Sequence, residues 1–122
     1  MADRIFLNEE GLIEVQVEGD QTYMTFENLK PDATELLNKL QQAGKPRLGL
    51  IDISKQGKFS ADSNRAAMEV LESLNYDKLA IYGGNAITTE VSKAIVLAMG
   101  KSGNTKVYQK REEAVNWLLG KE

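Results

Sequence analysis

The first quarter of the chain alternates apolar and polar residues in the manner of β-strands. Residues 4–7 are mostly apolar and lead into a polar turn, and from Ile13 to Glu18 every second residue is apolar. A period of two places alternate side chains on opposite faces, so this stretch predicts a strand with one face in water. Residues 22–26 are again rich in strand-forming types. The pattern predicts an antiparallel β-hairpin or meander of two or three strands.

The period becomes helical from Pro31 onward. Proline suits the first turn of a helix, and Gly44 suits its end. Three further helices are predicted: one with Ser60 as its N-cap, one capped by Thr88 or Thr89, and one near the end of the sequence. The predicted inner faces, in chain order, are Ala33, Leu36, Leu37 and Leu40; Ala67, Val70, Leu71 and Leu74; Val91, Ala94, Ile95, Ala98 and Met99; and Ala114, Val115, Trp117 and Leu118.

Three short apolar runs separate these helices, at residues 48–53, 79–82 and 106–108. The first is apolar almost throughout, which is typical of a strand covered on both faces. Strands that alternate with helices indicate right-handed crossovers and a parallel sheet. The sequence therefore predicts an α/β fold, in which an N-terminal hairpin or meander joins a mostly parallel βαβαβα sheet with about four helices.

Composition excludes more functions than it suggests. A chain of 122 residues is long enough for one domain, which we expect to span residues 1–122. It contains no cysteine and no histidine, so disulfides, thiolate zinc sites and the commonest general base are all absent. A net charge of −3 argues against nucleic-acid binding, which normally needs a basic surface. No targeting signal or membrane-spanning run is present, so we expect a cytoplasmic protein without membrane insertion.

Polar residues gather in the loops that follow the predicted parallel strands. Ligands of open α/β sheets bind beyond the carboxyl ends of the strands, where hydroxyls, glycines and helix N-termini can hold an anion. The same residue types are also ordinary turn and cap residues, so both interpretations stay open. The candidate binding residues are Asp52, Ser54, Phe59, Ser60, Asp62 and Arg65 from the first loop and helix start, and Gly83, Gly84, Asn85 and Thr88 from the second.

No set of residues predicts catalysis or metal binding. Residues 100–102 resemble the end of a phosphate-binding P-loop, but Ile95 stands where the first glycine is needed and the segment follows a helix. Lys55 and Lys58 lie near serines, but a lysine in an exposed loop stays protonated and cannot act as a base. We expect no enzymatic activity, no catalytic residue, no metal and no cofactor.

Four segments, in order, carry a resemblance to a known family: LIDIS at 50–54, ADSNRA at 61–66, LAIYGG at 79–84 and VYQKREEAVNWL at 107–118. Together they make the run from Leu48 to Leu119 resemble a STAS domain, the fold of bacterial anti-sigma factor antagonists. The likeness is greatest to the antagonist-like bacterial branch that is often called STAS-like. The N-terminal strands match the family by topology only.

The resemblance implies a role for Ser63. In such antagonists a partner kinase phosphorylates a serine that follows an aspartate at the start of the second helix, and the phosphate blocks binding to that kinase/anti-sigma protein. Asp62 and Ser63 form the matching pair, which makes Ser63 the candidate phospho-acceptor. The family pattern continues with serine or threonine and then glycine, where this chain has Asn64 and Arg65, and the preceding loop is longer here. These departures count against the switch.

The function implied by the resemblance is that of a non-enzymatic regulatory module. It would dock a protein partner, of the kinase/anti-sigma kind or another regulator, through the second helix and its adjacent loops. The alternative is a small-molecule module that holds a lipid or a nucleotide at the C-terminal edge of the parallel strands. A homodimer is a further expectation, formed through the N-terminal edge strand and Phe59, although Phe59 could equally pack beneath the second helix as a hydrophobic staple.

Overall fold

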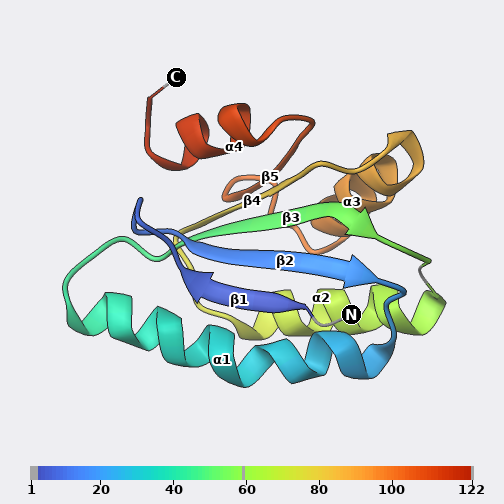
Figure 1. Ribbon diagram of the computed structural model, residues 1–122, viewed down its shortest axis with the longest axis horizontal. Helices are drawn as coiled ribbons and strands as arrows, with labels where there is room; N and C mark the ends of the chain where they lie inside the picture. The colour runs from blue at the N-terminus through green and yellow to red at the C-terminus, as the bar shows by residue number, and fades with distance from the viewer. Residues whose placement is uncertain (1–2, 59, 122) are drawn as a thin grey trace.

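The computed structural model describes residues 3–58 and 60–121, which form an α/β fold. Figure 1 shows a central twisted sheet with helices on both sides. In chain order the elements are β1 (Arg4–Leu7), β2 (Ile13–Gly19), α1 (Tyr23–Gln42), β3 (Leu48–Gln56), α2 (Ala61–Ser73), β4 (Lys78–Tyr82), α3 (Ala86–Ala98), β5 (Thr105–Tyr108) and α4 (Arg111–Leu118). The predicted α/β class, N-terminal hairpin and four helices are therefore confirmed.

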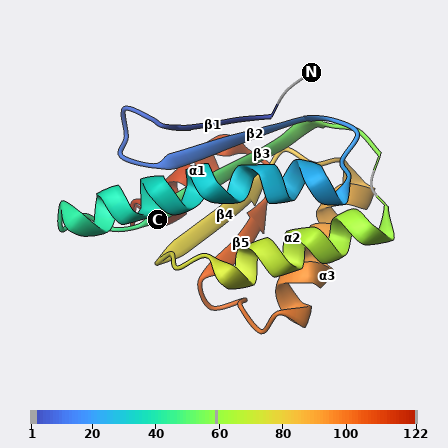
Figure 2. The same ribbon diagram turned by 90° about the horizontal axis from the view of Figure 1, so that it is seen from below.

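The strands lie in the sheet in the same order as in the chain, β1-β2-β3-β4-β5. β1 pairs antiparallel with β2, and all other pairs are parallel. Because each crossover adds its new strand on the same side, the three crossover helices should share one face of the sheet. The packing agrees: α1 and α2 lie side by side beneath the sheet (Figure 2), and Val96 of α3 packs with Ile53 and Ile81 on that same face.

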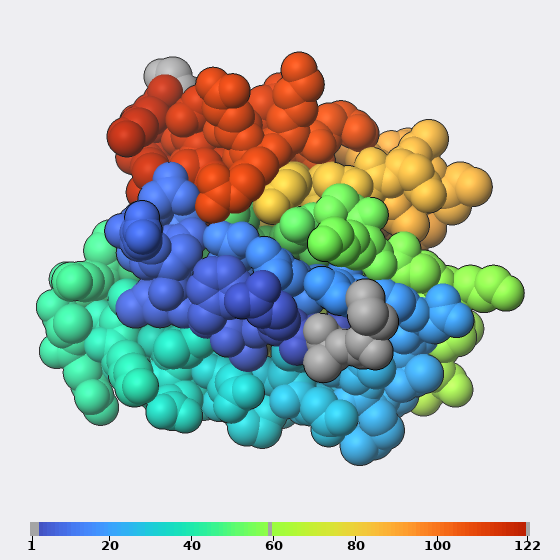
Figure 3. Space-filling model, in the orientation of Figure 1, coloured from blue at the N-terminus to red at the C-terminus, as the bar shows by residue number. Residues whose placement is uncertain are grey.

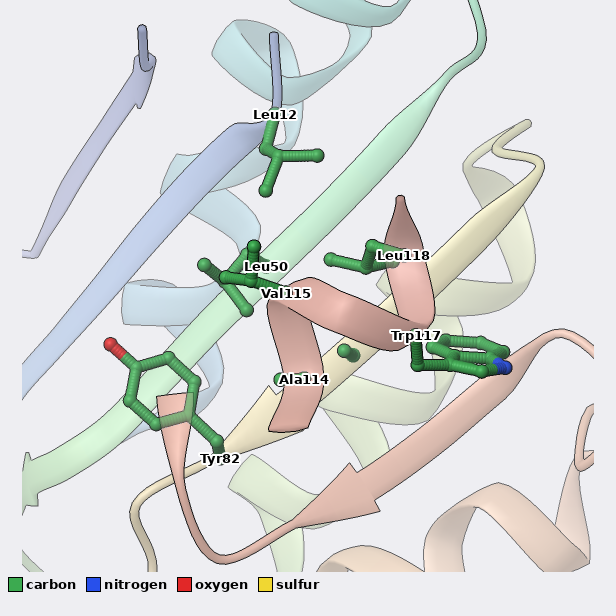
Figure 4. Packing of buried hydrophobic residues seen from close by; sticks show 8 residues of the cluster. Leu12, Leu50, Tyr82, Ala114, Val115, Trp117 and Leu118 are labelled. Atoms are coloured by element: carbon green, nitrogen blue, oxygen red, sulfur yellow. The ribbon is translucent and has the colours of Figure 1, made fainter. Parts of the chain in front are cut away.

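Among the helices of the described residues, α4 is the one that covers the opposite face of the sheet. Its buried residues Ala114, Val115, Trp117 and Leu118, all predicted as its inner face, pack on Leu12, Leu50 and Tyr82 (Figure 4). Because α4 has eight residues and lies mainly over β3, β4 and β5, it covers only Leu12 and Glu14 of the hairpin segment on this side and leaves most of β1 and β2 uncovered. Figure 3 shows the hairpin, in dark blue, at the surface between α1 and α4.

The first helix begins eight residues earlier than predicted. Residues 22–26 form no third strand, because Thr22 caps α1: its side chain accepts a hydrogen bond from the Thr25 N–H, and the Thr25 side chain accepts one from the Thr22 N–H. Pro31 accordingly lies inside the helix, on its exposed side, where the carbonyl that its missing N–H leaves unpaired is open to solvent. Gly44, at φ +68°, follows the C-cap as predicted.

The inward face of the third helix matches the predicted one only in part: Val91, Ile95 and Met99 are half-buried, and Met99 packs on the core. Thr89 and Val96 are buried, whereas Ala94 and Ala98 are exposed. The sequence of α3 is apolar on nearly every side, and Ile87 and Leu97 remain 75% and 73% exposed. With so little polar contrast around the helix, periodicity does not determine which stripe faces the sheet.

Two strand predictions also need correction. β3 extends beyond Ile53 to Gln56, because its last residues pair with the end of β2 after a register shift, so Ser54 is a strand residue. Glu14, predicted on the wet face of β2, is only 6% exposed. Its face of the sheet is covered at this point by Arg111, the first residue of α4.

Candidate functional site

The end of β4 lies beside the middle of β3 and brings together residues from both predicted loops. Asp52 and Tyr82 lie opposite each other in the parallel pairing, and Gly83 follows directly. The Asp52 Oδ1 accepts a hydrogen bond of 2.8 Å from the Ser54 N–H. A Cβ on Gly83 would lie 3.0 Å from the Ser54 Cβ and 3.2 Å from the Asp52 Oδ1. The sequence thus correctly placed Asp52, Ser54 and Gly83 at one edge.

The turn between β4 and α3 is held by its own side chains. Asn85 is the N-cap of α3, not Thr88 or Thr89 as predicted, and its Oδ1 accepts from the Thr88 N–H at 2.9 Å. Thr89 is buried, and its Oγ1 accepts a 3.3 Å hydrogen bond from the Gln109 side chain. Gly84 has close neighbours too, because a Cβ there would lie 2.5 Å from the Thr88 Oγ1. The polar groups of this turn therefore bind one another.

The start of α2 is fixed by two serines. Ser60 is the N-cap, as predicted, and its Oγ accepts from the Ser63 N–H at 3.0 Å. The Ser63 Oγ accepts from the Ser60 N–H and donates to the Ser60 carbonyl, both at 2.8 Å. Ser63 is wholly buried. The candidate phospho-acceptor hydroxyl is thus part of the helix cap, and an incoming kinase could reach it only if this first turn opened.

Asp62 and Arg65 project outward from the same turn. Their side chains are 73% and 64% exposed and form an ion pair of 3.3 Å. Arg65 also lies 6.0 Å from the centre of the Tyr23 ring, and the Tyr23 hydroxyl donates to a Glu69 carboxylate oxygen at 3.0 Å. These four residues join the start of α1 to the outer face of α2. Tyr23 and Glu69 were missed from the sequence because their contact spans two helices.

Where β4 ends beside β3, the electrostatics are dominated by Tyr82. Burial of its ring, followed by the nearby Asp52 and Glu14 carboxylates, raises the pKa of Tyr82 to about 12. Its hydroxyl therefore stays protonated and can serve only as a hydrogen-bond donor or acceptor near neutral pH. Glu14 is itself paired, since its carboxylate accepts from Asn8 at 2.9 Å and from Arg111 at 3.2 Å. The sequence did not predict the pairing of Glu14 with Arg111 either, because the two residues are far apart in the chain.

The structure separates the candidate residues into two groups. One group lies where β4 ends beside β3 and consists of Asp52, Ser54, Gly83, Gly84, Asn85 and Thr88. The other lies at the start of α2 and consists of Ser60, Asp62, Ser63 and Arg65. Phe59 lies outside the described residues. Within residues 3–58 and 60–121 no cluster of three or more acidic side chains is suited to hold a metal ion, and no helix is long and apolar enough to cross a membrane.

Comparison with known proteins gives likeness in structure and none in sequence. No protein-family model and no curated protein matches the chain. A crystal structure of an uncharacterised protein of the DUF3478 family from Shewanella loihica, described as having a SpoIIAA-like fold, matches with a TM-score of 0.63 and 19% identity. The match covers 96% of this chain and 92% of the other.

The unphosphorylated form of the anti-sigma factor antagonist SpoIIAA matches with a TM-score of 0.61 and 11% identity, over 98% of this chain and 99% of that protein. The fold is SpoIIAA-like. The STAS-like architecture implied by the four sequence segments is confirmed, and it extends over the N-terminal strands as well. At these identities the SpoIIAA-like fold is what the two chains share.

Proposed function

We propose that this chain is a non-enzymatic regulatory module that docks a protein partner in the cytoplasm through the exposed start of α2. The observation that carries the proposal is the geometry of that turn. Its backbone is held by the reciprocal Ser60–Ser63 cap, while Asp62 and Arg65 point into solvent. Preordered charges on a fixed helix end lose little entropy on binding, which favours recognition by another protein.

The chemistry of the surrounding residues supports docking rather than turnover. Where β4 ends beside β3, Asp52 accepts from the Ser54 N–H, Asn85 caps α3, and the Thr89 hydroxyl accepts from Gln109. The pKa of Tyr82 is raised to about 12, which removes it as a base near neutral pH. The anti-sigma factor antagonist that shares this fold is, by its name, a protein that acts on another protein.

Phosphorylation of Ser63 belongs to the proposal in a modified form. Because the Ser63 hydroxyl is buried and bonded to Ser60, a phosphate of about −1.5 to −2 charges would have no room in the closed cap. We infer that such a modification would act by opening the first turn of α2 and so disordering the docking surface. Intact-mass analysis and phosphosite mapping of protein from its native cells test this step separately.

The docking surface itself is tested by site-specific photo-crosslinking in those cells. A photoreactive amino acid at position 65 should give a discrete adduct with one protein, whereas the same group at exposed position 39 on α1 should not. The substitution Asp62→Lys should abolish the adduct from position 65 while leaving the fold unchanged. Equal crosslinking from both positions, or none from position 65, would overturn the proposal.

A further inference from the structure

A groove lies over the outer edge of β5, the last strand of the sheet. β5 pairs with β4 on one side, and within the described residues no strand lies on its other side. The groove has a volume of about 480 Å³. α3 lies beside β5 (Figure 2) and lines the groove with Lys93, Val96 and Leu97. The rest of the lining is Ser102 and the four residues of β5, from both of its faces, so the groove follows the strand edge itself.

The backbone of β5 directs hydrogen-bonding groups into this groove. The Leu79 N–H of β4 donates to the Asn104 carbonyl at 2.9 Å, so Asn104 points toward β4. Successive residues of a parallel strand point alternately to one neighbour and to the other. The carbonyl of Thr105 and both backbone groups of Val107 therefore point outward, whereas the Thr105 N–H donates to the Lys101 carbonyl. An open edge of this kind can accept a further strand.

The side chains around the groove are apolar or basic. Leu97 is 73% exposed beside the strand edge. Lys93 and Lys106 line the groove, and among the described residues no acidic side chain does. Lys93 also contacts Glu90 at 3.6 Å, but both side chains are exposed, and such pairs contribute little. The groove therefore favours an occupant that carries carboxylates together with an apolar side chain.

The same charges argue against a second copy of this chain as the occupant. A symmetric dimer brings the same surface of both copies together, so the two lysines of one copy would lie near those of the other. A short edge strand that carries a lysine is also how proteins protect an edge from aggregation. Leu97 does not serve that purpose, because an exposed leucine beside an open edge favours association.

We propose that β5 binds an extended acidic segment of another protein as a sixth strand of the sheet. Lys93 and Leu97 are four residues apart on α3, which is about 6 Å along the helix axis, and side chains two positions apart on a strand are separated by about 6.6 Å. A carboxylate and an apolar side chain at that spacing can meet Lys93 and Leu97. The residue between them lies on the other face, where Lys106 extends toward Trp117 of α4, and a second carboxylate suits it.

The test uses a seven-residue peptide with blocked ends, TVEEEVT, as the probe. Its sequence is the same in both directions, so it suits parallel and antiparallel addition alike. In NMR spectra the peptide should shift the Val107 amide and the Leu97 methyl resonances saturably, and it should slow hydrogen exchange of the Val107 N–H. The peptide TVKKKVT keeps the valines and the threonines but should need about tenfold higher concentration, because its charges repel the lysines.

Charge reversal in the protein locates the site. Lys93→Glu and Lys106→Glu should each weaken the binding of TVEEEVT about fivefold, and the double variant should prefer TVKKKVT. Lys106→Gln serves if Lys106→Glu fails to fold, because the Lys106 ammonium lies 5.4 Å from the centre of the Trp117 ring. Lys39→Glu makes the same charge change at an exposed residue of α1 and should leave binding unchanged.

The proposal fails if the Val107 amide shows no saturable shift, if both peptides bind equally, or if Ile5 of the other edge strand, β1, shifts as much as Val107. It also fails if the Val107 resonance moves with protein concentration alone while light scattering gives the mass of a dimer, since a second copy then fills the edge. The groove shares no residue with the start of α2. Crosslinking from position 65 therefore succeeds or fails independently of these results.

Discussion

Arg111, the first residue of α4, places its guanidinium 3.2 Å from the Glu14 carboxylate of β2, a residue 97 positions earlier in the chain. Arg111 also contacts Glu10 at 3.1 Å, and Asn8 donates to the same Glu14 oxygen at 2.9 Å. The Glu14 side chain is 8% exposed, whereas that of Arg111 is 44% exposed. A buried carboxylate thus ties the helix on one face to the hairpin at the edge.

Removing Arg111 should therefore destabilise the fold. The substitution Arg111→Ala leaves the Glu14 carboxylate buried without its cation, although Asn8 still donates a hydrogen bond to it. We expect a loss of about 1–3 kcal/mol in the free energy of unfolding. Combining it with Glu14→Gln should recover part of the loss, because the unpaired charge is gone. Urea unfolding of the two single variants and the double variant measures the coupling, and strictly additive effects would contradict a direct pair.

The serine cap of α2 should contribute measurably to stability. Replacing Ser60 with alanine removes the acceptor for the Ser63 N–H, and Ser63→Ala removes the reciprocal bond. Each should cost about 1 kcal/mol of unfolding free energy. The exposed Ser102 provides a control whose alanine variant should be near neutral. An unchanged stability of Ser63→Ala would show that the cap is weak, and would make this variant a clean phosphorylation control.

Gly83 should tolerate no side chain. It has φ +92°, and an added Cβ would meet both Ser54 and Asp52. The variant Gly83→Ala should lose about 1–3 kcal/mol, the usual cost of a forced left-handed backbone. At Gly103 an added Cβ meets nothing within 4 Å, so Gly103→Ala should be nearly neutral. Thermal unfolding of both variants makes the comparison, and similar losses would contradict the assigned geometry.

Stability should fall at high pH through Tyr82. Burial and the neighbouring carboxylates raise the pKa of Tyr82 to about 12, whereas an unfolded tyrosine ionises near about pH 10. The unfolded state therefore releases its proton first, and the advantage of the folded state is present below about pH 10 and declines as pH approaches 12. The free energy of unfolding of the wild type should therefore fall relative to that of Tyr82→Phe as the pH rises from about 10 to about 12. A constant difference would contradict the assigned shift.

The sequence predicted what local patterns determine and missed what distant contacts determine. The inner face of α4 was predicted fully, because Ala114, Val115, Trp117 and Leu118 stand out among polar neighbours. The start of α1 was wrong, although Phe26, Leu29 and Ala33 already follow a helical spacing that could have indicated it. The burial of Glu14 had no such signal, since alternation within a strand carries no information about Arg111.

In the candidate site, too, the sequence predicted features that depend on neighbouring residues and missed those that depend on distant contacts. Ser60 was correctly predicted as a cap because a single residue type before an amphipathic run indicates it. The cap of α3 was assigned to the wrong residue, since three candidate side chains stand within five positions: Asn85, Thr88 and Thr89. The burial of Ser63 has no signal in the sequence around Asp62, because serine is a mostly exposed residue type.

The sequential strand order has a consequence for how the protein is made. Each new strand emerging from the ribosome pairs with the strand synthesised just before it, so most of the sheet can assemble from the N-terminus onward. Glu14 is the exception, because its cation Arg111 follows it by 97 positions in the chain. Until Arg111 emerges, the Glu14 carboxylate lacks its cation, so the docking of α4 has to follow the pairing of the five strands that precede it in the chain.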